Sequence, residues 1–140
     1  SAAVLANPTS VMPTFTVDRD GDYVAQLIVN DGTVDSAPDS AIITTINAPP
    51  VANAGPDQGG VVPLSLIILD GSGSSDPNGD PLTYSWAFTN KPALSLAVLS
   101  STTSVSPTFI LDLPGDYVVE LIVNDGTVDS LPDSVTVTSP

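Results

Sequence analysis

The apolar residues of this chain fall in short runs, and the clearest run alternates with a period of two. Tyr117, Val119, Leu121 and Val123 share one face of an extended segment, which is the pattern of a half-buried β-strand. Proline, glycine and aspartate separate the runs, and prolines at this spacing exclude long helices. The strands predicted in this way cover residues 1–5, 14–17, 23–30, 40–45, 51–53, 63–70, 82–88, 95–99, 108–111, 117–124 and 134–138.

An internal repeat organises these strands. The ten residues Leu27–Ser36 recur without a change as Leu121–Ser130, an offset of 94 residues. At this offset 29 of the 45 pairs between residues 1–45 and 95–139 are identical. Each copy contains an apolar strand, a turn at Asp-Gly and a second strand, which predicts a β-hairpin.

The repeat predicts one complete domain over residues 47–140 and the C-terminal half of a preceding domain over residues 1–46. The complete unit holds seven predicted strands separated by turns, so we expect an all-β fold with an immunoglobulin-like β-sandwich. Trp86 in the third strand and Tyr117 at the start of the sixth are typical of such a core, and Tyr117 is placed for a tyrosine corner.

The composition of the chain excludes several classes of functional site. The chain has no cysteine and no histidine, which excludes disulfide bonds, thiolate or imidazole metal ligands and serine–histidine catalysis. Only Arg19 and Lys91 are basic, and the net charge of −14 opposes binding to nucleic acid or to anionic membranes. No apolar run is long enough to span a membrane, so we expect no membrane insertion. No carboxylates lie in a pattern that favours a raised pKa, so we expect no catalytic residues and no enzyme activity.

Four segments of the complete unit carry a family resemblance. They are Pro-Val-Ala-Asn-Ala-Gly-Pro at 50–56, Leu-Asp-Gly-Ser-Gly-Ser-Ser-Asp-Pro-Asn-Gly-Asp at 69–80, Tyr-Ser-Trp-Ala-Phe at 84–88 and Gly-Asp-Tyr-Val-Val-Glu-Leu-Ile-Val-Asn-Asp-Gly at 115–126. With these segments the complete unit resembles a PKD (polycystic kidney disease) domain, and residues 1–45 resemble its second half. Trp86 is followed by Ala-Phe-Thr-Asn, where many family members have Asp-Phe-Gly-Asp-Gly. The chain is similar to a Tyr-Ser-Trp-x-Phe branch found in tandem arrays of large bacterial and archaeal surface proteins.

This resemblance implies a non-catalytic structural or adhesive module, extracellular or at the cell surface, within a tandem array that is part of a surface layer, sheath or fibre. Its partners would be neighbouring copies or repeats of the same protein, with a surface polysaccharide or protein as a further ligand. The alternative is an accessory substrate-binding module of a secreted enzyme that degrades polysaccharide or protein. Near-identical consecutive units favour the array, whereas an exposed row of aromatic residues would favour the accessory module.

The loop Asp76-Pro-Asn-Gly-Asp80 is the candidate metal site. Asp76, Asn78 and Asp80 place three oxygen-bearing side chains within five residues, a pattern that suits a hard cation. The sandwich topology brings two more segments to the same pole, which adds Asp125 and Asn47 to the candidate ligands. Some PKD domains of secreted collagenases are similar here and bind calcium, so the resemblance implies calcium as the ion. The alternative is a turn in which Asp and Asn bond their own backbone.

Three other features have competing interpretations. Trp86 could offer a stacking platform for carbohydrate, but its place in an alternating strand favours core packing. Lys91 could form an isopeptide cross-link, although its position before a proline favours a loop. Val118, Ile122 and the run 64–69 put apolar side chains on outer faces, which are either scattered surface residues or a contact with another domain or subunit.

Residues 1–46 raise the question of what covers their apolar face. The inward side chains Phe15, Tyr23, Leu27 and Val29 have no facing sheet within the half domain. Two explanations are open: the polypeptide continues upstream as part of a longer array, or neighbouring chains pack against the fragment. We favour both together, in a periodic extracellular fibre or surface layer.

Overall fold

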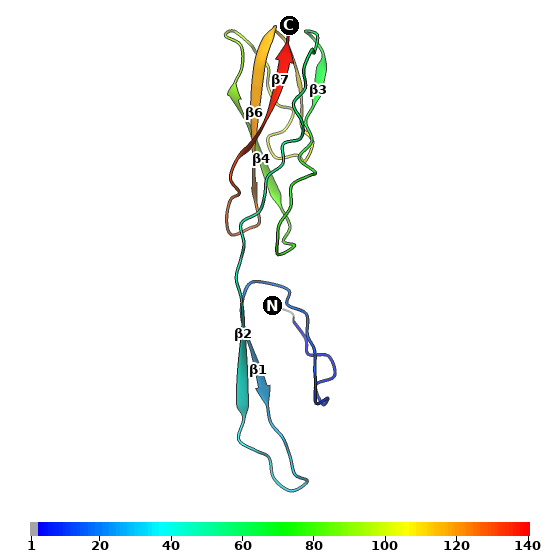
Figure 1. Ribbon diagram of the computed structural model, residues 1–140, viewed down its shortest axis with the longest axis vertical. Coiled ribbons are helices and arrows are strands. Elements are labelled where there is room, and N and C mark those ends of the chain that lie inside the picture. The colour runs from blue at the N-terminus through cyan, green and yellow to red at the C-terminus, as the bar shows by residue number, and fades with distance from the viewer. Residues whose placement is uncertain (1–2) are drawn as a thin grey trace. The chain divides into compact units, whose positions relative to one another are not determined.

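The computed structural model describes residues 3–140, which divide into two compact units with the boundary between Asn47 and Ala48. The described residues contain no helix, and so none that is long and apolar enough to cross a membrane. The first unit contains β1 (Gly21–Leu27) and β2 (Asp39–Thr45). The strands of the second unit are β3 (Leu66–Ile68), β4 (Thr83–Asn90), β5 (Thr108–Ile110), β6 (Gly115–Asn124) and β7 (Asp133–Ser139) (Figure 1).

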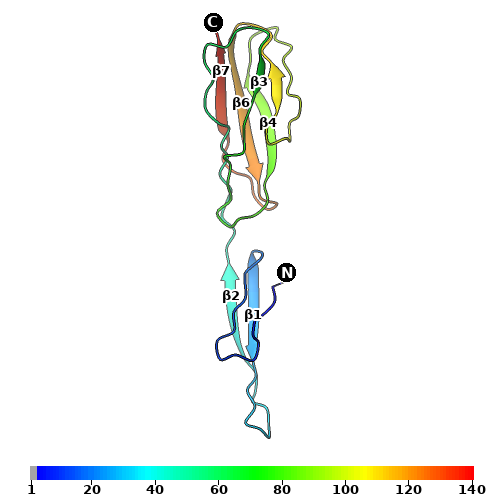
Figure 2. The same ribbon diagram turned by 90° about the vertical axis from the view of Figure 1, so that its right-hand side faces the viewer.

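The second unit is a sandwich of two antiparallel sheets. β4, β6 and β7 form one sheet with β6 in the middle, and β3 pairs with β5 in the other. Figure 2 shows these strands after a quarter turn from the view of Figure 1. The predicted all-β, immunoglobulin-like fold is therefore confirmed.

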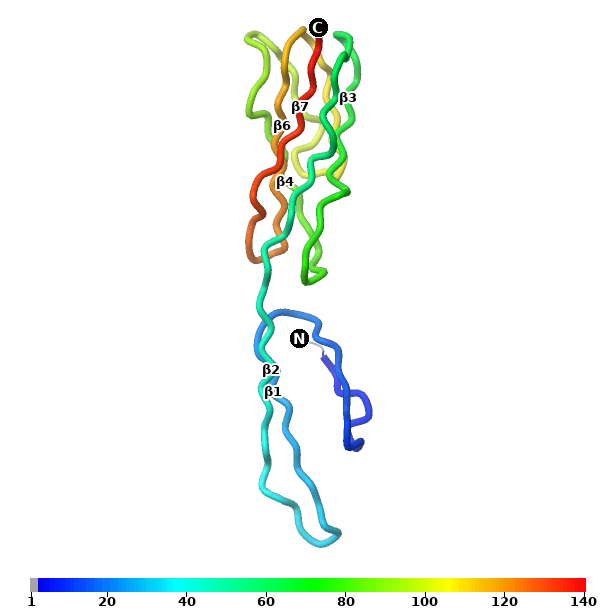
Figure 3. The backbone as a smooth tube through the Cα atoms, viewed as in Figure 1, coloured from blue at the N-terminus to red at the C-terminus, as the bar shows by residue number. Residues whose placement is uncertain are grey.

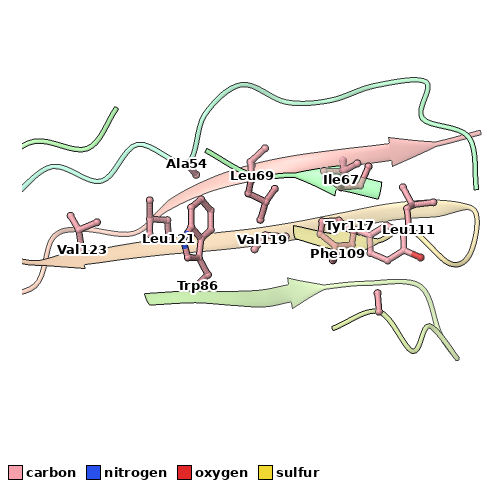
Figure 4. Close-up of a cluster of buried hydrophobic side chains, with 13 residues drawn as sticks. Ala54, Ile67, Leu69, Trp86, Phe109, Leu111, Tyr117, Val119, Leu121 and Val123 are labelled. Atoms are coloured by element: carbon pink, nitrogen blue, oxygen red, sulfur yellow. The ribbon is translucent and has the colours of Figure 1, made fainter. Parts of the chain in front are cut away.

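The core of the second unit lies between these two sheets. Along β6 the alternate residues Tyr117, Val119, Leu121 and Val123 are fully buried, as the period-two pattern predicts. Ile67, Leu69 and Phe109 come from the smaller sheet and its flanks, and Trp86, Val135 and Val137 come from the larger sheet. Figure 4 shows the labelled side chains of both sheets converging in the space between the strands.

The second unit has five strands rather than the seven expected. Residues 95–99 form no strand, because the carboxylate of Asp112 takes up polar groups of this segment: Leu96 N–H donates to Oδ2 and Ser95 Oγ donates to Oδ1, each over 2.6 Å. Residues 51–53 are reduced to bridges of Val51 with Ser75 and Leu131.

The second predicted strand of this unit, residues 63–70, is also shorter than expected, since β3 covers only Leu66–Ile68. Pro63 has no N–H to donate, and Leu64 has a φ of 70°, a left-handed conformation that breaks a strand. A pairing that the sequence analysis missed lies nearby. Gln58 N–H donates to the Thr136 carbonyl over 2.9 Å, so the segment before Pro63 runs alongside β7.

In the first unit β1 and β2 form a hairpin with the same register as β6 and β7. Tyr23 pairs with Ile43 as Tyr117 pairs with Val137, and every other pair of β1 with β2 also recurs 94 residues later. Figure 3 traces this hairpin and the segment that precedes it. The strands predicted at residues 1–5 and 14–17 reduce to one bridge between Ala6 and Thr14, and residues 1–2 lie outside the described part of the chain.

Candidate functional site

The loop predicted to bind a metal forms a hydrogen-bonded turn in the second unit. Asp76 Oδ1 accepts from the backbone N–H of Asn78 over 2.8 Å and from that of Asp80 over 3.0 Å. Asn78 Oδ1 accepts from Ala48 N–H over 2.8 Å and so ties the start of the unit to this loop. Gly79 closes the turn with a φ of 83°, which favours glycine. These contacts are those of the turn interpretation.

Two of the predicted ligands lie outside this loop. Asp125 follows β6, is 9% exposed, and its Oδ1 accepts from Thr127 N–H over 2.7 Å, from Thr127 Oγ1 over 2.8 Å and from Val128 N–H over 2.8 Å. These bonds stabilise the Asp-Gly turn between β6 and β7. Asn47 is the last residue of the first unit and directly precedes Ala48, and its role as a ligand stays a prediction.

The fit to calcium depends on one oxygen atom. Asp76 Oδ2 is buried and has no hydrogen-bond donor among the described residues, which leaves it available to a cation. Calcium takes about six to eight oxygen ligands. No three carboxylates within residues 3–140 come close enough together to hold a metal ion. A calcium ion at this loop would therefore need amide, backbone or water oxygens besides carboxylates, and its binding stays a prediction.

The predicted tyrosine corner is present. The Tyr117 hydroxyl lies 2.8 Å from Asp112 Oδ1 and 3.0 Å from the Leu113 carbonyl, and it accepts from Leu113 N–H over 3.0 Å. The Tyr117 side chain is fully buried. These contacts fix the turn before β6 against the core, as in immunoglobulin-like domains.

Asp112 has a structural role that the sequence analysis missed. Its hydrogen bonds, first the one from Ser95 and then that of Tyr117, hold the pKa of its carboxyl at about 2, against an ordinary value of 3.8. The ionised carboxylate therefore stabilises the fold above pH 3.8, and this contribution is lost as the pH falls through about 2. The repeat could have indicated this role, because an aspartate, Asp18, stands at the matching position of the first copy. Its Oδ1 lies 2.8 Å from the Tyr23 hydroxyl.

None of the aromatic side chains offers an exposed platform for carbohydrate. The chain has one Trp, three Tyr and three Phe, all within the described residues, and each is buried or half-buried. Trp86 is 2% exposed and its Nε1 donates to the Ser104 carbonyl over 2.9 Å, so its core role is confirmed. Lys91 Nζ donates to the Ala97 carbonyl over 2.9 Å and lies 5.6 Å from the centre of the Phe88 ring. This hydrogen bond and cation–π contact account for the position of the lysine.

The smaller sheet of the second unit presents apolar side chains on its outer face. Leu66 and Ile68 of β3 are 59% and 60% exposed, and Ile110 of β5 is 46% exposed. Val118 and Ile122 of β6, also predicted to face outward, are half-buried. The outer face of the smaller sheet is thus the more apolar surface of the two.

Comparison with known proteins assigns the second unit to a family. The family described as PKD domain matches residues 47–138. The human dyslexia-associated protein KIAA0319 is 39% identical over 80 residues, which are 54% of this chain and 7% of that protein. Its mouse homologue is 32% identical over 111 residues, which are 76% of this chain and 10% of that protein. The chain therefore spans about a tenth of the length of these curated relatives.

Solved structures share this fold. The solution structure of the PKD domain from KIAA 1837 protein has a TM-score of 0.54 at 30% identity, over 69% of this chain and 92% of that one. A nucleoside hydrolase-related hypothetical protein from Saccharophagus degradans, associated with carbohydrate metabolism, has a TM-score of 0.58 at 24% identity, over 67% of this chain and 26% of that one. This second likeness concerns the fold alone. With the family match, the buried Trp86 and the tyrosine corner at Tyr117, the chain belongs to the PKD domain family.

Proposed function

We propose that the chain is a non-catalytic structural or adhesive module of an extracellular or cell-surface protein built from tandem PKD domains. Such a protein would be part of a surface layer, sheath or fibre. The observation that carries this proposal is the recurrence of a whole hairpin. The two copies share ten consecutive residues and the complete strand register, and they lie 94 residues apart in the sequence. Units that repeat in this way build length rather than a single reactive site.

The polar contacts of the hairpin recur together with its register. Asn30 Nδ2 donates to Asp35 Oδ1, and Asn124 Nδ2 donates to Asp129 Oδ1, over 2.7 Å in both copies. In both copies the same Asn side chain also accepts from the glycine two residues later, from Gly32 N–H over 2.6 Å and from Gly126 N–H over 2.7 Å. The residues that the two copies share therefore include those that shape the turn, which supports a structural role.

The alternative function, an accessory substrate-binding module of a secreted enzyme, lacks such support. Carbohydrate-binding modules use exposed aromatic faces as contact area, whereas the seven aromatic side chains here are buried or half-buried. The charge of the chain, with 16 acidic and two basic residues, also opposes anionic polysaccharides. We therefore rank the tandem-array function first.

A series of joined units tests this function. Constructed proteins of one, two and three copies of residues 47–140 should lengthen by a constant increment per copy in small-angle X-ray scattering, because Pro49 and Pro50 at each junction favour a stiff, extended linker. The same proteins should not co-sediment with cellulose, chitin or an alginate gel. Co-sedimentation that saturates at micromolar protein would replace this proposal by the accessory-module function. A length that grows only as the square root of copy number would show that the units do not form a spacer.

Weak calcium binding at the loop of Asp76 is a second proposal, supported by the buried Oδ2 atom of that residue. A module of dissociation constant near 1 mM, in the range of extracellular calcium modules, would gain about 1.4 kcal/mol in 10 mM calcium. That gain corresponds to a rise in melting temperature of about 5–10 °C for a domain of this size. We expect this rise relative to a chelator, measured by differential scanning calorimetry.

A variant of the same residue gives the control for calcium. Asp76→Asn keeps an oxygen to accept from Asn78 and Asp80 N–H but replaces the second carboxylate oxygen, so it should remove the calcium effect without unfolding the unit. Asp116→Asn changes an exposed carboxylate elsewhere and should keep the effect. Magnesium at the same concentration controls for screening of the −14 net charge. Equal melting temperatures in calcium and chelator would end the calcium proposal.

A further inference from the structure

The inner face of the β1–β2 hairpin carries the residues of a PKD core but is open to solvent. Leu27 and Val29 are 62% and 57% exposed, whereas their counterparts Leu121 and Val123 in the second unit are 0% exposed. Tyr23 is half-buried, although its hydroxyl makes the tyrosine-corner contacts of Tyr117. The local structure of the first unit is thus complete, and what differs from the second unit is the cover over this face.

A groove of ≈ 680 Å³ lies along this face within the first unit. Its apolar lining includes Leu5, Pro13, Ala25, Leu27, Val29 and Ala41. The consecutive residues 25–29, at the end of β1 and just after it, line the groove together with Asp39 and Ala41 of β2. Such a largely apolar groove on a hairpin is unusual for a surface that remains in water.

The second unit shows what covers the equivalent face. Ala54, Ile67, Leu69 and Trp86 pack against β6 and β7, and all of them come from residues 48–94, the half that has no counterpart in the first unit. We call this segment, residues 48–94, the front half. Within it, Trp86 pairs by register with Leu121, so a tryptophan strand lies along the outer edge of β6.

The front half also uses the other edge of the hairpin. Gln58 N–H donates to the Thr136 carbonyl over 2.9 Å, and Ala54 N–H donates to Asp133 Oδ2 over 2.7 Å. The repeat places Ile42 and Asp39 at the positions of Thr136 and Asp133. The first unit thus presents the matching carbonyl and carboxylate as well as the apolar face.

We propose that the open face of the first unit is the binding site for the front half of a PKD repeat, a polypeptide with the strands and the tryptophan of residues 48–94. The occupant adds one strand beside β1 and an extended segment beside β2, and it fills the groove with apolar side chains. This inference rests on the proposed tandem-array function, because it takes the two hairpins for the same part of one repeating domain. Recognition combines main-chain pairing at the strand edges with the burial of Leu27 and Val29.

The test adds the missing half to the full chain. A second copy of residues 47–94 is fused directly before Ser1, so that its Leu94 is followed by Ser1 as the native Leu94 is followed by Ser95. We expect a second cooperative transition in calorimetry, loss of the fluorescence of the dye ANS bound to the unfused chain, and a rise of about 100-fold in the lifetime of residues 1–46 under protease. The native second unit is the internal reference, since its own transition should not change.

The control fusion carries Trp86→Asp in the added copy only. It has the same length, yet a carboxylate in place of the indole cannot enter the core, so the new transition should be absent. A wild-type fusion that gains no transition and no protection over this control would overturn the proposal. So would an unfused chain that is already protected over residues 1–46 because it self-associates through this face, as shown by analytical ultracentrifugation.

The two proposals fail separately. The scattering series uses only complete units, so a failed fusion leaves the tandem-array function standing. Conversely, binding of a polysaccharide by the complete unit would remove the array function, while the fusion would still show whether the front half occupies the open face.

Discussion

Replacing Leu121 by aspartate is expected to unfold the second unit, whereas the same replacement at Leu27 is expected to change stability little. Leu121 is 0% exposed and Leu27 is 62% exposed. Loss of a buried leucine side chain alone costs about 2–5 kcal/mol, and burial of an unpaired carboxylate adds several more. The sum approaches the whole stability of a small domain, about 5–15 kcal/mol. A substitution at an exposed position changes the free energy of unfolding by no more than about 0.5 kcal/mol.

The repeat makes this a matched comparison. Both leucines begin the same ten-residue segment and pair with an aspartate in the same register, so strand propensity and turn chemistry are equal. The measurement is urea denaturation, followed by the fluorescence of Trp86 for the second unit and by the rate of proteolysis of residues 1–46 for the first. Equal losses of stability at the two positions would show that the face of β1 is covered in the chain as it stands.

Replacing Trp86 by alanine is expected to cost the second unit about 3–5 kcal/mol. The side chain is 2% exposed, and its loss leaves the Ser104 carbonyl without the indole N–H that donates to it over 2.9 Å. The indole packs closely against the backbone around it. Gly71 lies so close that an added Cβ would stand 3.0 Å from the indole ring and 3.1 Å from the Val105 carbonyl. The measurement is chemical denaturation followed by far-ultraviolet circular dichroism.

Leu131→Ala is the control for this substitution. Leu131 is 87% exposed, so its truncation should change the free energy of unfolding by less than about 0.5 kcal/mol. A cost below about 1 kcal/mol for Trp86→Ala would contradict the core role of the indole and reopen the possibility of a surface function for it.

The parts of the fold that follow from local pattern were predictable from the sequence. The alternation from Tyr117 to Val123 identifies the inner face of β6. Side chains alternate between the two faces of a strand, so the positions of the apolar residues show which face lies against the core. The Asp-Gly turns and the repeat identify both hairpins and their equivalence. The burial of Trp86 followed from its place in such an alternating strand.

The predictions that were wrong or missing concern segments whose structure depends on residues far away in the sequence. Residues 95–99 have a strand-like composition, but the backbone N–H of Leu96 donates to the carboxylate of Asp112. No local pattern predicts that a side chain will accept this hydrogen bond in place of a neighbouring strand. The pairing of Gln58 with β7 joins segments about 80 residues apart, beyond the reach of turn and period arguments. At the loop of Asp76 the same oxygens suit both a turn and a cation, so composition could not choose between them.

The central claim is that the chain contains the same half domain twice, once covered and once open. Native-state hydrogen exchange by NMR tests it most directly, because Leu27–Ser36 and Leu121–Ser130 have the same sequence and hence nearly the same intrinsic exchange rates. We predict that the hydrogen-bonded amides of Leu121–Ser130 exchange at least about 100-fold more slowly than their counterparts in Leu27–Ser36, since only the former are protected by a packed core. Equal protection of the two segments in a monomeric chain would contradict the account.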